Sequence, residues 1–521
     1  MIKNPIIRGF CPDPSIIKAN GLFYIATSTF EWWPGVKLFE SSDLKNFRQI
    51  ASPLKRRSQL DLTGVPPSAG VWAPCLSYDG RLFYLVYTDV KTKKGRYYNT
   101  NNYAVWTDDI YGDWSEPVYL NSIGFDPSLF HDDDGKKYLV NMINGFKGIT
   151  VQELDSRTLS PVGERVTVYK GSGIGCTEGP HIYHIGDYYY LIAAEGGTGY
   201  DHCVTMARAE SVYGPYITAR NNPLYTSDRN QGLQKCGHGD IIEADNKRWY
   251  LLHLCARPGR DGGGCLLGRE TAIQEIELSK EGFFEPKGGS PYCLSAIEDA
   301  EGLPEYEKGD ELNVYDRFEE ETIDVRYSSF RWDYAGFAHI DPGRNELVIR
   351  GEESLNSLFH VSLLAVRQKE HACRTETVMH FEPEAEEHFA GLAYVYDNLN
   401  WYIFGKTLNE EGIPVLVIQK SDRGTITDLT APVEVRQKGD ITLRIETDGY
   451  TIRFGFYTDD RFVEIDAEGT TGILTDEYCR GFTGAHFGMY VHDMLNKRIT
   501  AGFKSFRMEY PEYGSDIKTG D

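Results

Sequence analysis

Five stretches in about the first 300 residues share one pattern of apolar and polar positions. In each, a short apolar segment leads into a turn rich in Gly, Asn or Asp, and a Tyr- or Trp-rich segment follows. This pattern is typical of β-hairpins. The units start about 50 to 60 residues apart, a period typical of propellers and solenoids. They read DPSIIKANGLFYIATST from Asp13, APCLSYDGRLFYLVYTD from Ala73, DPSLFHDDDGKKYLVNM from Asp126, EGPHIYHIGDYYYLIAAE from Glu178 and HGDIIEADNKRWYLLHL from His238.

A third apolar segment follows each hairpin, and several units then end in a further aromatic segment. The third segments are residues 36–41, 103–107, 149–154, 203–209 and 266–273. The closing aromatic segments include residues 44–47, 113–114 and 212–216. Four strands in each of five units predict an N-terminal five-bladed β-propeller over residues 1–304.

The residues that open the five units are the candidates for a functional site. The first strand of each propeller blade faces the central channel, so these residues are expected to converge at one mouth of it. In chain order they are Asp13, Trp72-Ala73, Asp126, Glu178 and His238. Carboxylates held close together repel, which raises the pKa of one and leaves another ionised. An inverting glycosidase needs such an acid and base pair. The alternative is that each Asp-Pro is only a turn.

Beyond Pro304 the repeat stops. The acidic stretch AIEDAEGLPEYEKGDELN is typical of a linker. After it, apolar and polar residues alternate with a period of two, and no amphipathic stretch of helical length intervenes. The alternation predicts a C-terminal β-sandwich over residues 313–521, so the whole chain is expected to be all-β.

Charge and composition limit the partners. The formal net charge of −23 argues against nucleic acid and anionic membranes and favours a neutral ligand. The first residues, MIKNPIIRGFCPDP, do not show the apolar core of a signal peptide, which predicts a cytoplasmic protein with reduced thiols. Cys11, Cys176 and Cys236 each precede the opening residue of a unit by two positions. A zinc site is the less favoured interpretation of these thiols, and ordinary burial is the favoured one.

Six motifs in order, NPIIRGFCPDPSI, ATSTFEWWPGV, VWAP, GFDPSLFHDDDG, TEGPHIY and LGRETAIQ, resemble glycoside hydrolase family 43. The resemblance is to its two-domain β-xylosidases, and it covers nearly the whole chain. It implies a five-bladed propeller followed by a β-sandwich of the jelly-roll, concanavalin-like kind. The chain departs from the family pattern at Cys11, where Asn is commoner, and at Trp33, where Phe is commoner.

The resemblance also implies roles for individual residues. Asp13 would be the general base, Glu178 the general acid, and Asp126 the residue that orients the acid and keeps its pKa raised. Arg269 would bind a substrate hydroxyl near Asp126. His238 would lie at the channel floor; no cofactor is required, although a calcium ion near His238 is an option.

Three aromatic residues complete the implied substrate site. Phe30 and Trp72 would wall the pocket for the terminal sugar. Phe503, in the looser motif GFKSF, would extend from the sandwich toward the active site. The expected partner is a neutral oligosaccharide, and the protein is expected to form a homo-oligomer, either a dimer or a tetramer.

The leading hypothesis is an exo-acting, inverting β-xylosidase on short β-1,4-xylo-oligosaccharides. The same scaffold also carries α-L-arabinofuranosidases, and the sequence does not separate the two activities. A retaining fructosidase and a non-catalytic sugar-binding propeller are the less favoured alternatives. The fructosidase would place its two carboxylates about 5 Å apart, against about 6.5–9.5 Å in an inverting enzyme.

Overall fold

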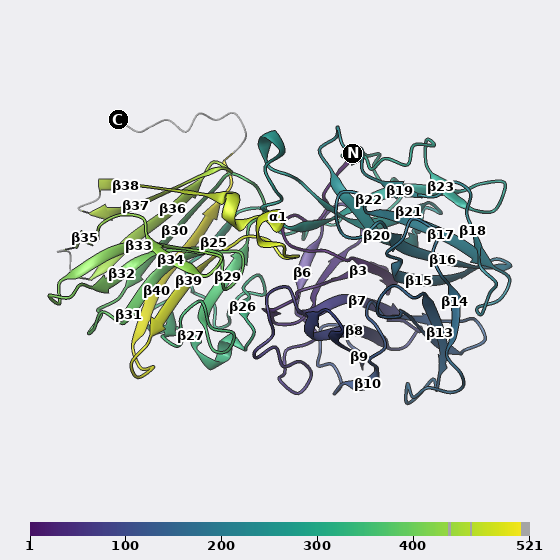
Figure 1. Ribbon diagram of the computed structural model, residues 1–521, viewed down its shortest axis with the longest axis horizontal. Helices are drawn as coiled ribbons and strands as arrows, with labels where there is room; N and C mark the ends of the chain where they lie inside the picture. The colour runs from purple at the N-terminus through teal and green to yellow at the C-terminus, as the bar shows by residue number, and fades with distance from the viewer. Residues whose placement is uncertain (436–438, 459–460, 512–521) are drawn as a thin grey trace. The chain divides into compact units, whose positions relative to one another are not determined.

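The computed structural model describes residues 1–435, 439–458 and 461–511, and most of the regular structure in them is β-strand (Figure 1). The chain divides into two compact units. The first contains Met1–Pro258 and Gly268–Asp310, and the second contains Gly259–Leu267 and the chain from Glu311 onward. The all-β fold predicted from the sequence is confirmed. The short loop Gly259–Leu267 groups with the second unit, a detail that the sequence pattern does not reveal. None of the helices in the described residues is long and apolar enough to span a membrane.

The first unit is a propeller. Within the described residues it has five antiparallel sheets whose strands follow one another in sequence order. Their innermost strands touch in the order β2, β7, β11, β15, β20 and back to β2, which closes the ring. The strands of the five blades, from the inside outward, are β2 (Ser15–Ala19), β3 (Leu22–Thr27), β5 (Lys37–Ser41) and β6 (Arg48–Ile50); β7 (Gly70–Tyr78), β8 (Phe83–Lys94), β9 (Tyr97–Thr107) and β10 (Val118–Asn121); β11 (Ser128–His131), β12 (Lys137–Met142), β13 (Ile149–Leu154) and β14 (Val166–Tyr169); β15 (Glu178–Ile185), β16 (Tyr188–Glu195), β17 (Cys203–Ala209) and β18 (Ile217–Thr218), with β19 (Tyr225–Thr226) beside β17; and β20 (Gln234–Glu243), β21 (Trp249–Ala256), β22 (Arg269–Leu278) and β23 (Phe284–Pro286).

The outer strands differ from the sequence prediction. The closing strands β6, β10 and β18 each begin after the aromatic segment that was expected to form them. The apolar residues of those segments are buried from turns instead: Leu44 is fully buried at a positive φ of 61°, and Trp114 is 2% exposed. An apolar run therefore marked a buried turn at these places, because burial alone does not distinguish a strand from a packed loop.

The N-terminal segment closes the ring against the last blade. β1 (Ile2–Lys3) pairs with β24 (Ala296–Ile297), which lies after the last blade in the sequence. The Asn4 side chain donates to the carbonyl of Ile273 at 2.8 Å and accepts from its N–H at 2.9 Å. Cys11 N donates to the carbonyl of Arg269 at 2.9 Å. The start of the chain is thus bonded along β22 of the fifth blade.

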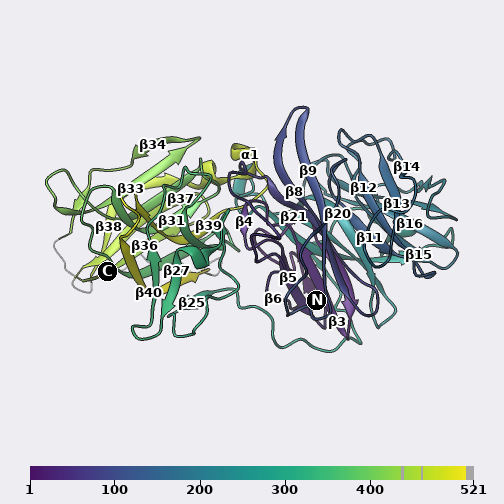
Figure 2. The same cartoon turned by 90° about the horizontal axis from the view of Figure 1, so that it is seen from below.

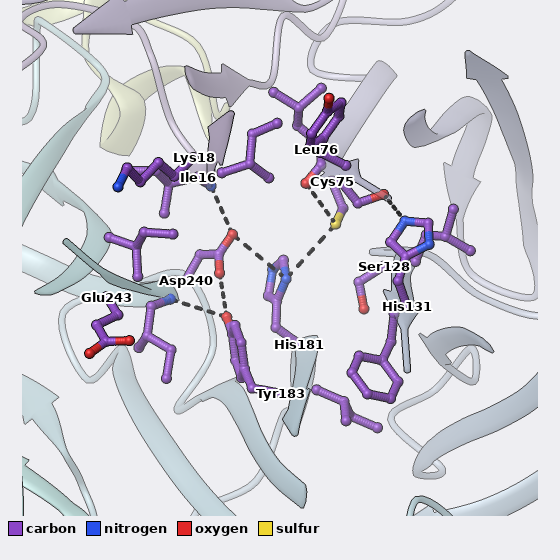
Figure 3. Close-up of a pocket in the computed structure, with 18 of the residues that line it drawn as sticks. Ile16, Lys18, Cys75, Leu76, Ser128, His131, His181, Tyr183, Asp240 and Glu243 are labelled. Atoms are coloured by element: carbon purple, nitrogen blue, oxygen red, sulfur yellow. Dashed lines mark hydrogen bonds and ion pairs between the residues drawn. The ribbon is translucent and has the colours of Figure 1, made fainter. Parts of the chain in front are cut away.

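A cavity of about 390 Å³ lies among the inner strands, lined by all five of them (Figure 3). In this cavity the side chain of Asp240, on the fifth blade, contacts residues of the two neighbouring blades. One carboxylate oxygen accepts from Ile16 N at 2.8 Å, and the other accepts from the Tyr183 hydroxyl. The hydroxyl in turn accepts from Ile241 N at 3.1 Å. One buried carboxylate therefore joins three blades.

Replacing Asp240 by Ala is expected to lower the free energy of unfolding by about 3 kcal/mol, because it leaves the Ile16 N–H and the Tyr183 hydroxyl without an acceptor. The matched control is Asp245→Ala. Asp245 is more than half exposed and forms a surface ion pair with Lys18, so a change below about 1 kcal/mol is expected. Urea unfolding of both variants measures the difference, and equal effects would contradict the bridging role of Asp240.

The second unit is a sandwich of two antiparallel sheets whose facing surfaces form one apolar core. The strands of the first sheet are β25 (Val314–Asp316), β27 (Ala338–Asp341), β28 (Glu346–Arg350), β40 (Thr500–Glu509), β30 (Cys373–His380), β36 (Asp440–Thr447), β37 (Thr451–Thr458) and β38 (Arg461–Thr470), and those of the second are β29 (Ser362–Arg367), β39 (His486–Asp493), β31 (His388–Val395), β32 (Trp401–Leu408), β33 (Pro414–Asp422), β34 (Thr425–Asp428) and β35 (Val433–Glu434). The remaining elements are β4 (Trp32–Trp33), β26 (Ser329–Phe330), the helix α1 (Asp476–Cys479) and 3₁₀ turns at Arg260–Gly262, Tyr334–Gly336 and Thr471–Leu474.

Candidate active site

The five blades share one unusual backbone position. Equivalent residues at or near the start of the five inner strands share a positive φ between 33° and 55°, a left-handed conformation that is uncommon for residues other than glycine. Non-glycine residues held in this region store strain and are concentrated at functional sites. The five residues are Asp13 (54°), Ala73 (33°), Asp126 (52°), Gly179 (55°) and His238 (52°).

This backbone signature corrects the register assumed from the sequence. Asp13 and Asp126 are equivalent, but the fourth blade has Gly179 at that position, and Glu178 lies one residue earlier. The strand pairing of β15 with β16 is irregular between Glu178 and His181, which indicates a bulge. Glu178 thus occupies the position that Trp72 and Phe125 hold in the second and third blades.

Asp13 is buried, with 6% of its surface exposed, and three groups stabilise its ionised form. Ser28 Oγ donates to Asp13 Oδ2 at 2.6 Å, Arg269 Nη1 lies 3.3 Å from Asp13 Oδ1, and His238 Nδ1 lies 3.6 Å from the same oxygen. Burial by itself raises the pKa of Asp13, but Arg269, His238 and the Ser28 hydrogen bond together lower it below its ordinary value. Asp13 is therefore an anion across the neutral range, as a general base must be.

Glu178 has the opposite protonation state. Burial, and then the nearby charge of Asp13, raise the pKa of Glu178 to about 8, so its carboxyl group is protonated at neutral pH. Asp126 shifts in the same direction: burial, and then the charges of Glu178 and Asp13, raise the pKa of Asp126 well above its ordinary value. Asp126 Oδ2 accepts from Gly179 N at 3.1 Å, next to the acid in the chain. This contact fits the predicted orienting role, while the raised pKa of Glu178 is explained by burial and Asp13.

Phe30, Trp72 and Arg269 lie together beside Asp13. The ring centroids of Phe30 and Trp72 are 6.1 Å apart, and the Arg269 guanidinium lies 5.4 Å from the centroid of Phe30. Phe30 is fixed by a pair of backbone hydrogen bonds to Val71, each 3.0 Å long. The structure thus brings both predicted aromatic residues to the base, with Arg269 nearer to Asp13 than the sequence suggested.

Phe125 and Tyr98 are aromatic residues of this site that the sequence reasoning missed. The centroid of Phe125 lies 5.3 Å from that of Trp72, and Tyr98 lies 6.3 Å from both. Burial and the charge of Glu178 raise the pKa of the Tyr98 phenol. Phe125 could have been predicted from the sequence, because it precedes Asp126 as Trp72 precedes Ala73. Tyr98 could not, because it belongs to the long hairpin of β8 and β9, which extends beyond the second blade (Figure 2).

Replacing Tyr98 by Ala is expected to raise KM for a disaccharide substrate about 2- to 10-fold, since one aromatic contact is worth about 0.5–1.5 kcal/mol. A Tyr98→Phe variant keeps the ring and should stay within about twofold of the parent. Steady-state kinetics on both variants measures the difference. Equal KM values for the Ala and Phe variants would exclude ring stacking as the function of Tyr98.

His238 and His202 place two neutral imidazoles near Asp13. Burial lowers the pKa of His238 to about 4 and that of His202 to about 3. A Cβ atom added at Gly179 would lie 2.8 Å from His238 Nε2, so the imidazole packs directly on this glycine. His202 Nε2 is buried without a hydrogen-bond partner within the described residues. Calcium prefers oxygen ligands, so a calcium ion at this place would contact His238 through its own bound water molecules. The charge of the ion would lower the pKa of Asp13 further. The calcium near His238 stays a prediction.

Phe503 and two of the three cysteines are buried in apolar cores. Phe503 is completely buried in the apolar core of the sandwich, where it pairs with Leu347, so its position does not support the predicted contact with substrate. Cys11 and Cys236 lie in two different apolar cores of the propeller, and Cys176 is exposed. The three thiols therefore do not converge on the channel as a metal site.

The site combines a buried carboxylate anion, a protonated carboxyl group and surrounding aromatic rings. Enzymes that hydrolyse glycosidic bonds use this combination of groups. Comparison with known proteins gives the family. The model of glycosyl hydrolases family 43 matches residues 2–284, and that of the beta xylosidase C-terminal concanavalin A-like domain matches residues 315–509. The chain belongs to glycosyl hydrolases family 43, so the resemblance and the two-domain fold predicted from its motifs are confirmed.

Several relatives match over almost their full length. A beta-xylosidase of Bacillus subtilis (strain 168) is 40% identical, with 97% of this chain and 99% of that protein covered. Xylosidase/arabinosidase 43B of Humicola insolens is 38% identical, with 99% of both chains covered. The crystal structure of xylan beta-1,4-xylosidase from Bacillus halodurans C-125 has a TM-score of 0.94 at 39% identity and covers 98% of this chain and 100% of that one.

The two shifted carboxyl groups predict a broad plateau in the pH profile. The base is active when ionised, and the pKa of Asp13 lies below its ordinary value of 3.8. The acid is active when protonated, and the pKa of Glu178 is about 8. We therefore expect kcat/KM to be nearly constant between about pH 5 and pH 7 and to fall with a midpoint near pH 8. Initial rates after preincubation at each pH separate titration from unfolding. An alkaline midpoint near pH 5 would contradict the assigned state of Glu178.

Proposed function

We propose that the protein is an exo-acting, inverting glycosidase that releases D-xylose from the non-reducing end of short β-1,4-xylo-oligosaccharides. The observation that carries the proposal is a pair of buried carboxyl groups in different surroundings: Asp13 is held by Ser28 and Arg269, which favour its ionised form, while burial and the charge of Asp13 favour the protonated form of Glu178. In this mechanism Asp13 takes a proton from the attacking water, and Glu178 gives one to the leaving oxygen. The names of the relatives supply the sugar: those from Bacillus subtilis and Bacillus halodurans are both called xylosidases.

Arg269 supports this assignment of roles. It contacts Asp13, and its charge also lowers the pKa of Asp126 and Glu178. A guanidinium in this position stabilises the ionised base and offers donors to sugar hydroxyls. Phe30 and Trp72 supply apolar faces for the ring of the terminal sugar.

The test is hydrolysis of xylotetraose labelled at its reducing end. We expect unlabelled xylose and labelled xylotriose as the first products, which defines attack from the non-reducing end. Proton NMR during the first turnovers should show α-xylose, because inversion converts a β-linkage to an α-product. β-Xylose as the first anomer would refute the inverting mechanism, and absence of xylose release would refute the substrate.

A second candidate is α-L-arabinofuranosidase activity at the same site, alone or beside the first. It rests on two relatives: the Humicola insolens protein, named xylosidase/arabinosidase, and a non-reducing end alpha-L-arabinofuranosidase of Bacteroides ovatus that is 30% identical. Linkage is a separate question, because a Vibrio relative at 35% identity is named xylan 1,3-beta-xylosidase. Comparing kcat/KM on aryl β-xylopyranoside, aryl α-L-arabinofuranoside and the β-1,4- and β-1,3-linked xylobioses ranks these alternatives.

A further inference from the structure

Three buried side chains that the proposed reaction does not use meet in the fifth blade of the propeller. Cys236 lies on β20, His253 on β21, and Cys293 in the segment that leads to β24. Their two sulfur atoms and one ring nitrogen all lie within 4.8 Å of one another. None of the three is more than 1% exposed, and neither Cys236 nor Cys293 forms a disulfide. The cluster does not include Asp13 or Glu178, and Cys236 and Cys293 pack in one apolar core of the propeller.

The orientation of His253 suits a metal ligand. Its Nδ1 lies 2.8 Å from the carbonyl oxygen of Leu254. A carbonyl only accepts, so Nδ1 must carry the proton and Nε2 the lone pair. Metal-binding histidines are typically fixed in this way, by donation from the other nitrogen to a carbonyl. The amide nitrogen of Gln274 lies 3.4 Å from Nε2 and also donates to the carbonyl of Leu294 at 3.1 Å. An amide has two N–H donors, so the second one can donate to Nε2, and a bound ion would replace this long contact.

We infer that Cys236, His253 and Cys293 form a structural binding site for a zinc ion. In tetrahedral zinc sites the Zn–S and Zn–N distances are about 2.3 and 2.0 Å, which separates neighbouring ligand atoms by about 3.3–3.8 Å. Ligand atoms already within 4.8 Å of one another reach that geometry through shifts of about 1 Å or less. Two thiolates and an imidazole select a borderline or soft cation over calcium or magnesium, whose preferred ligands are oxygens.

Cys255 offers a fourth ligand. It follows His253 by two residues on β21, and side chains two apart in a strand point to the same face. Cys255 is fully buried and packs in the same apolar core as Cys236 and Cys293. With it, the set becomes three cysteines and one histidine, a common composition of structural zinc sites.

The ion would reinforce closure of the propeller. Cys293 N donates to Thr226 O at 3.0 Å, which holds the segment against β19. A few residues later in the chain, β24 pairs with β1. Zinc between Cys293 and the two inner strands of the fifth blade would therefore fix the closing segment to that blade, and with it the partner of the N-terminal strand.

The test uses the full-length protein, purified under reducing conditions without immobilised metals and dialysed against a small excess of zinc. Mass spectrometry of metals is expected to find about one zinc per chain, and Cys293→Ser is expected to reduce this to less than about a tenth. Cys203→Ser is the matched control, since Cys203 is a buried thiol of the fourth blade outside the cluster, and it should keep the full zinc content.

Two measurements on the unaltered protein keep the inference testable if Cys293→Ser does not fold. Cobalt exchanged for zinc should show thiolate-to-cobalt charge transfer and the d–d absorption of a tetrahedral site. Removing zinc with a chelator should lower the midpoint of thermal unfolding, and adding it back should restore the midpoint. Failure to bind zinc or cobalt, full zinc content in Cys293→Ser, or a Cys236–Cys293 disulfide in the purified protein would overturn the inference.

Discussion

Replacing Asp13 by Asn is expected to reduce kcat/KM by about 10³- to 10⁴-fold on xylobiose and on an aryl β-xylopyranoside alike. Asparagine has nearly the same shape and can still accept the hydrogen bond from Ser28, but it cannot take a proton from water. A better leaving group does not compensate, because the attacking water needs a base with either substrate. Steady-state kinetics on the two substrates measures the effect.

The Asn variant also carries an internal control. The charge of Asp13 is the second cause of the raised pKa of Glu178. Without it, the alkaline limb of the residual activity should move below about pH 8. An unaltered thermal unfolding midpoint would show that the fold is intact. A loss of about tenfold or less, or an alkaline limb that does not move, would contradict the assignment of Asp13 as the base next to Glu178.

Replacing Glu178 by Gln is expected to depend strongly on the leaving group. On xylobiose, whose departing oxygen must be protonated, kcat/KM should fall by about 10³-fold or more. On an aryl xyloside with an acidic phenol, the loss should be only about tenfold, because the phenolate leaves with little assistance. The variant should also lack the alkaline limb near pH 8, since the group that titrates there is gone.

The comparison of two leaving groups separates the acid from a structural role. If the Glu178→Gln substitution merely distorted the site, both substrates would lose activity to the same degree. Equal losses would therefore refute the general-acid assignment, even if the variant were inactive. Asp13→Asn gives equal losses for a different reason, so the two variants together identify the base and the acid independently.

Much of the site follows from the repeat. A hairpin pattern repeated five times predicted the five blades, and one position per blade led to Asp13, Asp126 and His238. Glu178 was found in the right unit but one residue out of register, because its carboxylate lies one position before the residue equivalent to Asp13 and Asp126, as Trp72 lies before Ala73. Tyr98 could not be found, because its hairpin has no counterpart in the other units.

Burial decides the surroundings of Phe503 and of two of the cysteines. The resemblance implied that Phe503 extends toward the active site, while ordinary burial was the favoured interpretation of the thiols. The structure buries Phe503, Cys11 and Cys236 in apolar cores. Sequence spacing fixes the order of side chains along a strand, but which face meets the channel depends on twist and bulges that spacing does not encode.

Because the N-terminal segment pairs with β22, catalytic activity should appear only when the propeller ring has closed. Asp13 and its partner Arg269 are separated by 256 positions in the chain, and the base loses its guanidinium in any intermediate that lacks the fifth blade. Contacts over such a span carry a high entropic cost and form late. During synthesis the base emerges long before its partner, and nearly the entire propeller is made in between. The recovery of activity during refolding should therefore follow ring closure rather than the formation of individual blades.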